Sequence, residues 1–236
     1  MTDINTLLKG VVELGIELNE KQREQFSNYK DMLKEWNEKI NITAITDDRE
    51  IDIKHFLDSL TPLKYFVGKK KVIDVGTGGG FPGLPLKILN NELDVTLLDS
   101  LNKRIIFLKE VIESLQLSNI VAVHGRAEEL GRMMEYREKY DICVSRAVAS
   151  LNTLSEYCMP FVKVGGYFIS MKGSNVEEEL KESENGIKIL GGKIVKKEII
   201  VLPESDIEHS LIIIEKIKDT STKYPRAGGK PKKNPL

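Results

Sequence analysis

Residues 71–83 read KVIDVGTGGGFPG, a short β-branched run that carries an acid and leads into a loop with five glycines. Glycine lets the backbone turn tightly and approach a ligand that a Cβ atom would keep away. Pro82 suits the first turn of a helix, where its missing N–H costs nothing. The segment therefore predicts a strand, a ligand-binding turn and a helix in direct succession.

Two cofactors compete for this loop. The glycines at 78, 80 and 83 match the spacing of a dinucleotide loop, but they begin late for a turn that leaves the strand at Ile73. Counted from the strand end, the glycines stand at 76, 78 and 80, and Phe81 takes the place of a third dinucleotide glycine. Asp74 at the strand tip suits a cationic sulfonium better than a pyrophosphate. The loop thus favours S-adenosylmethionine (SAM), with an NAD-dependent oxidoreductase as the alternative.

The apolar run at 72–75 is followed, beyond the loop, by similar runs at 95–98, 120–123, 142–145 and 166–171, with helical patterns such as 104–115 between them. Short strands that alternate with helices predict a parallel sheet covered on both faces. The last two runs, 193–202 and 210–217, are separated only by a short polar loop. We therefore expect an α/β, Rossmann-like fold that resembles class I SAM-dependent methyltransferases, with a seven-stranded, mostly parallel sheet and a terminal antiparallel hairpin.

Three segments differ in character. Residues 1–66 carry apolar side chains at helical spacing and predict a small N-terminal helical extension, and 67–217 form the predicted SAM-binding domain. The formal net charge of −1 excludes a globally basic protein, yet residues 218–236 hold six Lys or Arg against one Asp. Such a basic C-terminal tail is typical of polyanion contact, although a solvated, disordered end has the same composition.

The compartment and the metal content follow from what the sequence lacks. No apolar run approaches membrane-spanning length, and the N-terminus has no signal-peptide pattern. The two cysteines lie in apolar surroundings, without partners at metal-ligand spacing. We expect a cytoplasmic monomer with no membrane contact and no metal site.

Polar residues follow three further strands. Asp99 ends the second strand, where an acid can accept both ribose hydroxyls of an adenosine, or cap the next helix. Ala127 and Glu128 follow the third strand, where such folds hold adenine, although Glu in a first helical turn is also ordinary. Arg146 follows the fourth strand and needs a partner if buried: the cofactor's carboxylate, a substrate phosphate or a structural acid.

These motifs, in this order, resemble the RsmG (GidB) family, the ribosomal RNA small subunit methyltransferase G. The matching stretches are DVGTGGGFPG at 74–83, LDS at 98–100, SRA at 145–147, NIT at 41–43, HFLDS at 55–59 and the YPR…GKP…K…PL ending. The resemblance runs from about residue 36 to the end of the chain. It implies an enzyme that uses SAM to methylate N7 of one guanine in the 530 loop of bacterial 16S rRNA, nucleotide 527 in the usual numbering.

The glycine geometry and the resemblance together give the expected site. The expected cofactor contacts are Gly76, Gly78, Gly80, Phe81, Asp99, Ser100, Leu101, Ala127, Glu128 and Arg146. Arg146 and Asp58 are the candidates for a catalytic role, and Lys172, Arg226, Lys230, Lys232 and Lys233 are the expected rRNA contacts.

The three histidines lie far apart in the sequence, which agrees with a reaction that needs no general base. Guanine N7 carries a lone pair and no proton, so its methylation needs no general base, and alignment of the reactants becomes the main requirement. A non-catalytic RNA-binding or ribosome-assembly module that keeps a vestigial fold is the alternative from another class. The intact glycine loop, Asp99 and Arg146 argue against such decay.

Overall fold

The computed structural model describes residues 3–68, 70–146 and 149–236. Its seven strands form one sheet in the order β3-β2-β1-β4-β5-β7-β6. The strands are β1 Lys71–Val75, β2 Asp94–Asp99, β3 Ile120–His124, β4 Tyr140–Arg146, β5 Val162–Gly173, β6 Gly192–Val201 and β7 Glu208–Lys216. The strands β1 to β5 pair in parallel, and β7 runs antiparallel to both β5 and β6. The expected fold class, including the terminal hairpin, is confirmed.

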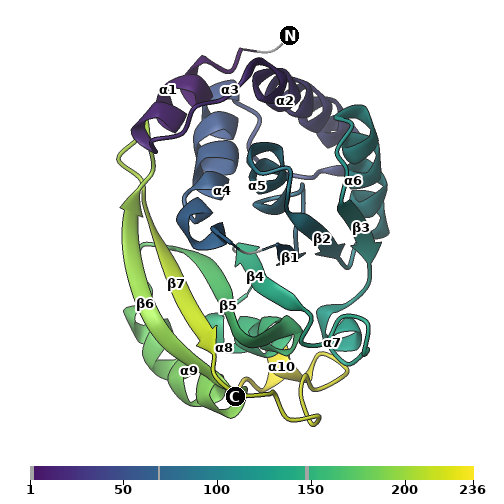
Figure 1. The fold of residues 1–236 in the computed structure, drawn as a ribbon, viewed down its shortest axis with the longest axis vertical. Helices are drawn as coiled ribbons and strands as arrows, with labels where there is room; N and C mark the ends of the chain where they lie inside the picture. Colours follow the sequence, from purple (N-terminus) through teal and green to yellow (C-terminus); the bar gives the residue numbers. More distant parts are fainter. Residues whose placement is uncertain (1–2, 69, 147–148) are drawn as a thin grey trace.

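Helices cover both faces of the sheet (Figure 1). The first layer contains α1 Asn5–Glu13, α2 Glu20–Ile40, α3 Asp48–Ile51, the π-helical η1 Asp52–Leu57, α4 Asp58–Leu60, the 3-10 helix η2 Leu63–Phe66, α5 Gly83–Leu89 and α6 Asn102–Ser114. The second contains α7 Ala127–Leu130, α8 Leu151–Cys158, the 3-10 helix η3 Met159–Phe161, α9 Glu177–Ile189 and α10 Lys230–Lys233. None of the helices within the described ranges is long and apolar enough to cross a membrane.

Alternate side chains of each central strand enter different cores, as the two-residue period of a strand requires. In β1, Val72 packs toward the N-terminal helices, whereas Ile73 packs toward α8 and α9. In β4, Val144 likewise packs toward the N-terminal helices and Cys143 packs toward α8 and α9. The first core also contains Leu7 and other residues of the N-terminal helices. Residues 4–66 are therefore packed into the same body as the sheet, rather than attached beside it.

Local signals explain where α2 begins and ends. Asn19 and Gln22 exchange side-chain to backbone hydrogen bonds at its start, which satisfies two amide groups that the helix itself cannot pair. Asn41 ends the helix in the left-handed conformation, with a φ of 50°. The Tyr29 hydroxyl of this helix donates to the carbonyl of Gly79, so α2 is tied to the glycine loop.

A buried ion pair joins α2 to η1. Lys30 Nζ lies 2.6 Å from Asp52 Oδ1, and the side chains are 0% and 2% exposed. Asp52 Oδ2 also accepts a hydrogen bond from the backbone N–H of Leu7 in α1. One carboxylate thus fixes the relative positions of three N-terminal helices.

Replacing Lys30 with Met should lower the free energy of unfolding by about 3–5 kcal/mol, because the Asp52 carboxyl then stays buried without its partner. Urea titration followed by circular dichroism measures this loss. Lys34→Met is the matched control, because its pair with Asp48 has both side chains 41% exposed. The control should cost less than about 1 kcal/mol. Similar losses in the two variants would contradict the assignment.

Candidate functional site

A cavity of about 650 Å³ opens at the carboxyl ends of β1, β2, β4 and β5. Its walls are Ile42, Thr43, Ile45, Lys54, His55, Asp58, Gly76, Thr77, Gly78, Gly79, Phe81, Asp99, Ser100, Arg104, Arg146, Met171, Lys172, Gly173, Ile207 and His209. This edge, where the strand order reverses between β1 and β4, is the usual ligand site of open parallel sheets. Residues of the N-terminal segment 42–58, together with Ile207 and His209 of the β6–β7 hairpin, complete the walls.

The glycine loop and Asp99 form one end of the cavity. Gly76 and Gly78 have φ values of 72° and 60°, which favour glycine. A Cβ on Gly78 would have no atom nearer than 4.0 Å, so this face of the loop is open. Asp99 Oδ2 accepts a hydrogen bond of 2.9 Å from the Gly78 N–H and lies 3.3 Å from Arg104. Backbone and carboxylate together offer polar contacts along the wall.

Asp74 supports the loop from behind. Its Oδ2 accepts hydrogen bonds from the Thr77 hydroxyl at 2.7 Å and from the Gly83 N–H at 2.8 Å. Burial raises the pKa of this carboxyl to about 6. Asp74 does not line the cavity, so the expectation that it lies near a sulfonium is wrong. Its carboxylate instead holds the turn in place through these two hydrogen bonds.

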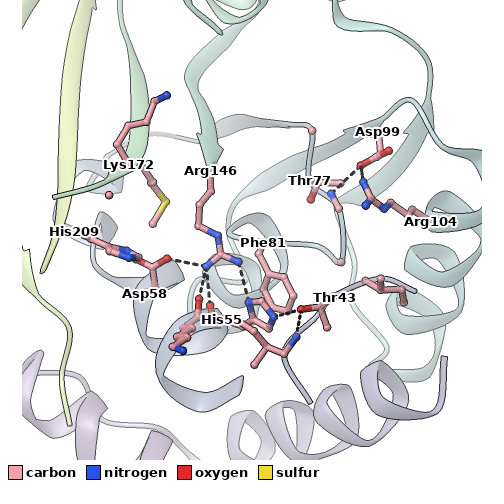
Figure 2. A pocket seen from close by; sticks show the side chains of 18 of the residues that line it. Thr43, His55, Asp58, Thr77, Phe81, Asp99, Arg104, Arg146, Lys172 and His209 are labelled. Atoms are coloured by element: carbon pink, nitrogen blue, oxygen red, sulfur yellow. Dashed lines mark hydrogen bonds and ion pairs between the residues drawn. The ribbon is translucent and has the colours of Figure 1, made fainter. Parts of the chain in front are cut away.

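Arg146 stands at the centre of the cavity (Figure 2). Its Nη1 donates to Asp58 Oδ2 at 2.9 Å and to the Lys54 carbonyl at 2.9 Å. Its guanidinium carbon lies 5.1 Å from the centre of the Phe81 ring, a cation–π contact. Of the three partners that the sequence left open, the structural acid is present and is Asp58.

Asp58 also holds His209 of β7, whose Nδ1 lies 2.9 Å from Asp58 Oδ1. The Asp58 side chain is 1% exposed. Burial raises the pKa of this carboxyl, but the hydrogen bond from His209 and the charge of Arg146 outweigh burial and bring the pKa below its usual value. Asp58 is therefore ionised at neutral pH.

His55 and Phe81 form a stacked pair beneath Arg146, with ring centres 4.5 Å apart and planes inclined by 14°. His55 Nε2 lies 2.8 Å from the Thr43 hydroxyl, and its Nδ1 lies 3.3 Å from Arg146 Nη2. Because a guanidinium only donates, Nδ1 is the acceptor and Nε2 carries the hydrogen. Burial, and then the charge of Arg146, lower the pKa of His55 to about 3, so the ring is neutral at neutral pH.

Several expected residues come together in the cavity wall, namely Gly76, Gly78, Phe81, Asp99, Ser100, Arg146, Asp58 and Lys172. Four expected cofactor contacts do not line it: Gly80, Leu101, Ala127 and Glu128. At Gly80, a Cβ would come within 2.4 Å of Leu84 and 2.7 Å of the Tyr29 hydroxyl, so its bare Cα permits close packing. The backbone N–H of Leu101 donates to Asp99 Oδ1, which orients that carboxylate. Ala127 and Glu128 begin α7, and Ala147 falls outside the described residues.

Sequence reasoning missed Thr43, Arg104, Met171, Ile207 and His209 as cavity residues. His209 is one of three histidines that lie far apart in the sequence. Its place opposite Gly173 in the β5–β7 ladder brings it to the cavity, and the predicted hairpin offered a signal for this. The register between strands, however, cannot be read from their periodicity alone.

The basic tail is docked on the second helical layer. Arg137 donates to the carbonyls of Thr220 and Tyr224, and Arg132 donates to that of Pro225. Arg226 holds both oxygens of Glu156, at 2.6 Å for Nη2–Oε2 and 2.9 Å for Nε–Oε1. Since Glu156 is completely buried, we reassign Arg226 from an RNA contact to the anchor of the tail.

The expected lysine contacts differ in availability. Lys230, Lys232 and Lys233 of α10 are exposed. Lys172 is instead 10% exposed and pairs with Glu179 at 2.7 Å, so its charge is largely satisfied within the fold.

Known proteins resemble this chain in sequence over nearly its full length. The family model described as rRNA small subunit methyltransferase G matches residues 22–206. A curated protein named ribosomal RNA small subunit methyltransferase G from Alkaliphilus metalliredigens is 56% identical over 98% of this chain and 97% of its own length. One of the same name from Acetivibrio thermocellus is 56% identical over 98% and 95%.

Solved structures share the fold at low identity. TYW2 of M. jannaschii in complex with AdoMet has a TM-score of 0.52 at 16% identity, covering 68% of this chain and 77% of its own. The fibrillarin pre-rRNA processing protein of Methanococcus jannaschii has a TM-score of 0.50 at 20% identity, covering 67% and 70%.

Replacing Arg226 with Ala should destabilise the protein by about 3–5 kcal/mol, because the buried Glu156 side chain then loses its partner. Urea unfolding gives the change. Lys223→Ala, a neighbouring exposed tail residue, should stay within about 0.5 kcal/mol of the parent. An Arg226→Ala protein of unchanged stability that binds RNA less tightly would restore Arg226 to the RNA contacts.

Proposed function

This chain belongs to the rRNA small subunit methyltransferase G family, and from that premise we propose that it uses SAM to methylate N7 of one guanine in bacterial 16S rRNA. The guanine is the one at nucleotide 527, in the 530 loop, and the reaction takes place in the cytoplasm. The observation that carries the proposal is the open glycine backbone linked to the Asp99 carboxylate at the cavity wall.

The residues present fit SAM. Gly76 and Gly78 leave room for the cofactor against the backbone, and the Asp99 carboxylate suits a pair of ribose hydroxyls. The buried carboxylate of Asp99 also tolerates a cationic ligand better than an anionic pyrophosphate. When bound, SAM would supply a methyl group on a cationic sulfur: the guanine N7 lone pair would bond to the methyl carbon as the carbon–sulfur bond breaks and the sulfur leaves as a neutral thioether, with no prior loss of a proton.

The side chains around the reacting centre act by position and charge. Arg146 is fixed by Asp58, by the Lys54 carbonyl and by the Phe81 ring, so it keeps one orientation in the cavity. His55 is neutral and has both ring nitrogens occupied, and therefore serves as support rather than as an acid. The ionised Asp58 offsets positive charge that develops on the methylated base.

Exposed lysines of the tail are the proposed rRNA contacts. Lys230, Lys232 and Lys233 lie together on α10, where the side chains of a single helical turn can reach neighbouring phosphates. Each phosphate neutralised by a lysine adds affinity that salt weakens. In this proposal the cavity beside the cofactor holds the target base, and α10 binds phosphates elsewhere on the same RNA.

Replacing Asp99 with Ala should raise the SAM dissociation constant at least about tenfold, which corresponds to about 1.4 kcal/mol. The variant loses the ribose contact and the brace on Gly78. Isothermal titration calorimetry with SAM measures the change, and Asp94→Ala, at the exposed start of the same strand, is the control. Equal affinity of the Asp99→Ala variant and the parent would remove Asp99 from the cofactor site.

Replacing Lys230, Lys232 and Lys233 together with Gln should weaken 16S rRNA binding and lower the slope of log affinity against log salt concentration by about two to three. Filter binding across a salt series measures the slope, and SAM affinity should not change. The control triple variant replaces the exposed Lys9, Lys21 and Lys109 on the opposite helical layer. A slope as steep as that of the parent would refute the contact.

A further inference from the structure

The end of the cavity away from Asp99 is a separate polar wall. Figure 2 shows Lys172, His209 and Asp58 on one side of Arg146, with Asp99 and Arg104 on the other. Met171, Gly173 and Ile207 complete the far side. If the adenosine lies against Asp99, this second half remains for the base that receives the methyl group.

The polar groups of this wall are largely engaged within the protein. Arg146 Nη1 is shared among Asp58 and the carbonyls of Lys54 and His55. Lys172 Nζ donates to the Ala149 carbonyl and to Glu179. The Nε2 atom of His209, in contrast, makes no hydrogen bond with any part of the chain that the structure describes.

The contact between His209 and Asp58 determines what Nε2 can do. Asp58 is ionised and can only accept, so Nδ1 of His209 carries the hydrogen of their 2.9 Å bond. In the neutral ring, Nε2 then holds a lone pair and is an acceptor. The His209 side chain is 28% exposed, so a ligand in the cavity can reach it.

We propose that His209 Nε2 accepts a hydrogen bond from N1–H of the target guanine, and that this contact selects guanine over adenine. The inference rests on the proposed function. Guanine carries hydrogen on N1, whereas adenine has a lone pair there that would oppose Nε2. Positive charge gained by the base during methylation makes N1–H more acidic, so the contact strengthens in the transition state.

Two variants of His209 separate this role from a structural one. His209→Asn keeps a donor near the position of Nδ1, and so keeps the Asp58 contact, but it has nothing at the position of Nε2. His209→Gln places an amide oxygen near the position of Nε2 and can accept from the base. We expect kcat/KM for 16S rRNA to fall at least about tenfold in His209→Asn and to stay within about threefold of the parent in His209→Gln.

SAM affinity, measured by calorimetry, should remain unchanged in both variants. A His209→Asn enzyme as active as the parent, or a His209→Gln enzyme as impaired as His209→Asn, would overturn the proposal.

Altered bases at the target nucleotide give an independent readout. Inosine keeps N1–H, whereas 2-aminopurine has a lone pair at N1. The parent should methylate 16S rRNA carrying inosine at a rate near that for guanine, and should lose at least about tenfold with 2-aminopurine. In His209→Asn, replacing guanine by 2-aminopurine should cause little further loss, because the two changes remove the same contact.

Equal additional losses in the parent and in His209→Asn would contradict the contact. Failure of the parent enzyme to methylate guanine itself would instead reject the proposed function, so the two failures remain distinguishable.

Discussion

The carboxylate of Asp58 is the constraint on which the site depends. It is buried at the start of α4, directly after η1, and it binds Arg146 from β4 and His209 from β7 at the same time. A buried charge is tolerated only when its lone pairs are used, so three segments remote in sequence must meet at this point. The N-terminal helices are consequently part of the site, because they position η1 through Lys30 and Asp52.

Sequence patterns predicted the sheet and the glycine-loop end of the cavity because both rest on local signals. A β-branched run followed by glycines specifies a strand and a turn whatever surrounds them, and Asp99 stands at a strand end that the alternation identifies. The far wall could not be read in this way. His209 reaches the cavity only through the register of β7 on β5, and Arg146 finds Asp58 across 88 residues of chain.

Charge by itself misled the interpretation of the tail. Six basic residues near the end of the chain suggested a uniform polyanion-binding segment, but Arg226 is used to neutralise Glu156. Its partner Glu156 lies 70 residues earlier, in α8, and nothing in the sequence marks Glu156 as buried. A similar misreading affected Asp74, whose position at a strand tip suggested a ligand contact although its oxygen caps the turn that follows.

The docking of the tail also bears on how the protein matures during translation. The carbonyls that accept hydrogen bonds from Arg132 and Arg137 belong to residues 220–225, and Arg226 follows directly. These residues are translated after all seven strands of the sheet and after α8, and domains begin to fold from the N-terminal side as they are made. Glu156 therefore leaves the ribosome well before Arg226, which stands 70 residues further along the chain. The second helical layer is thus made first, and docking of the tail onto it is a late step of folding.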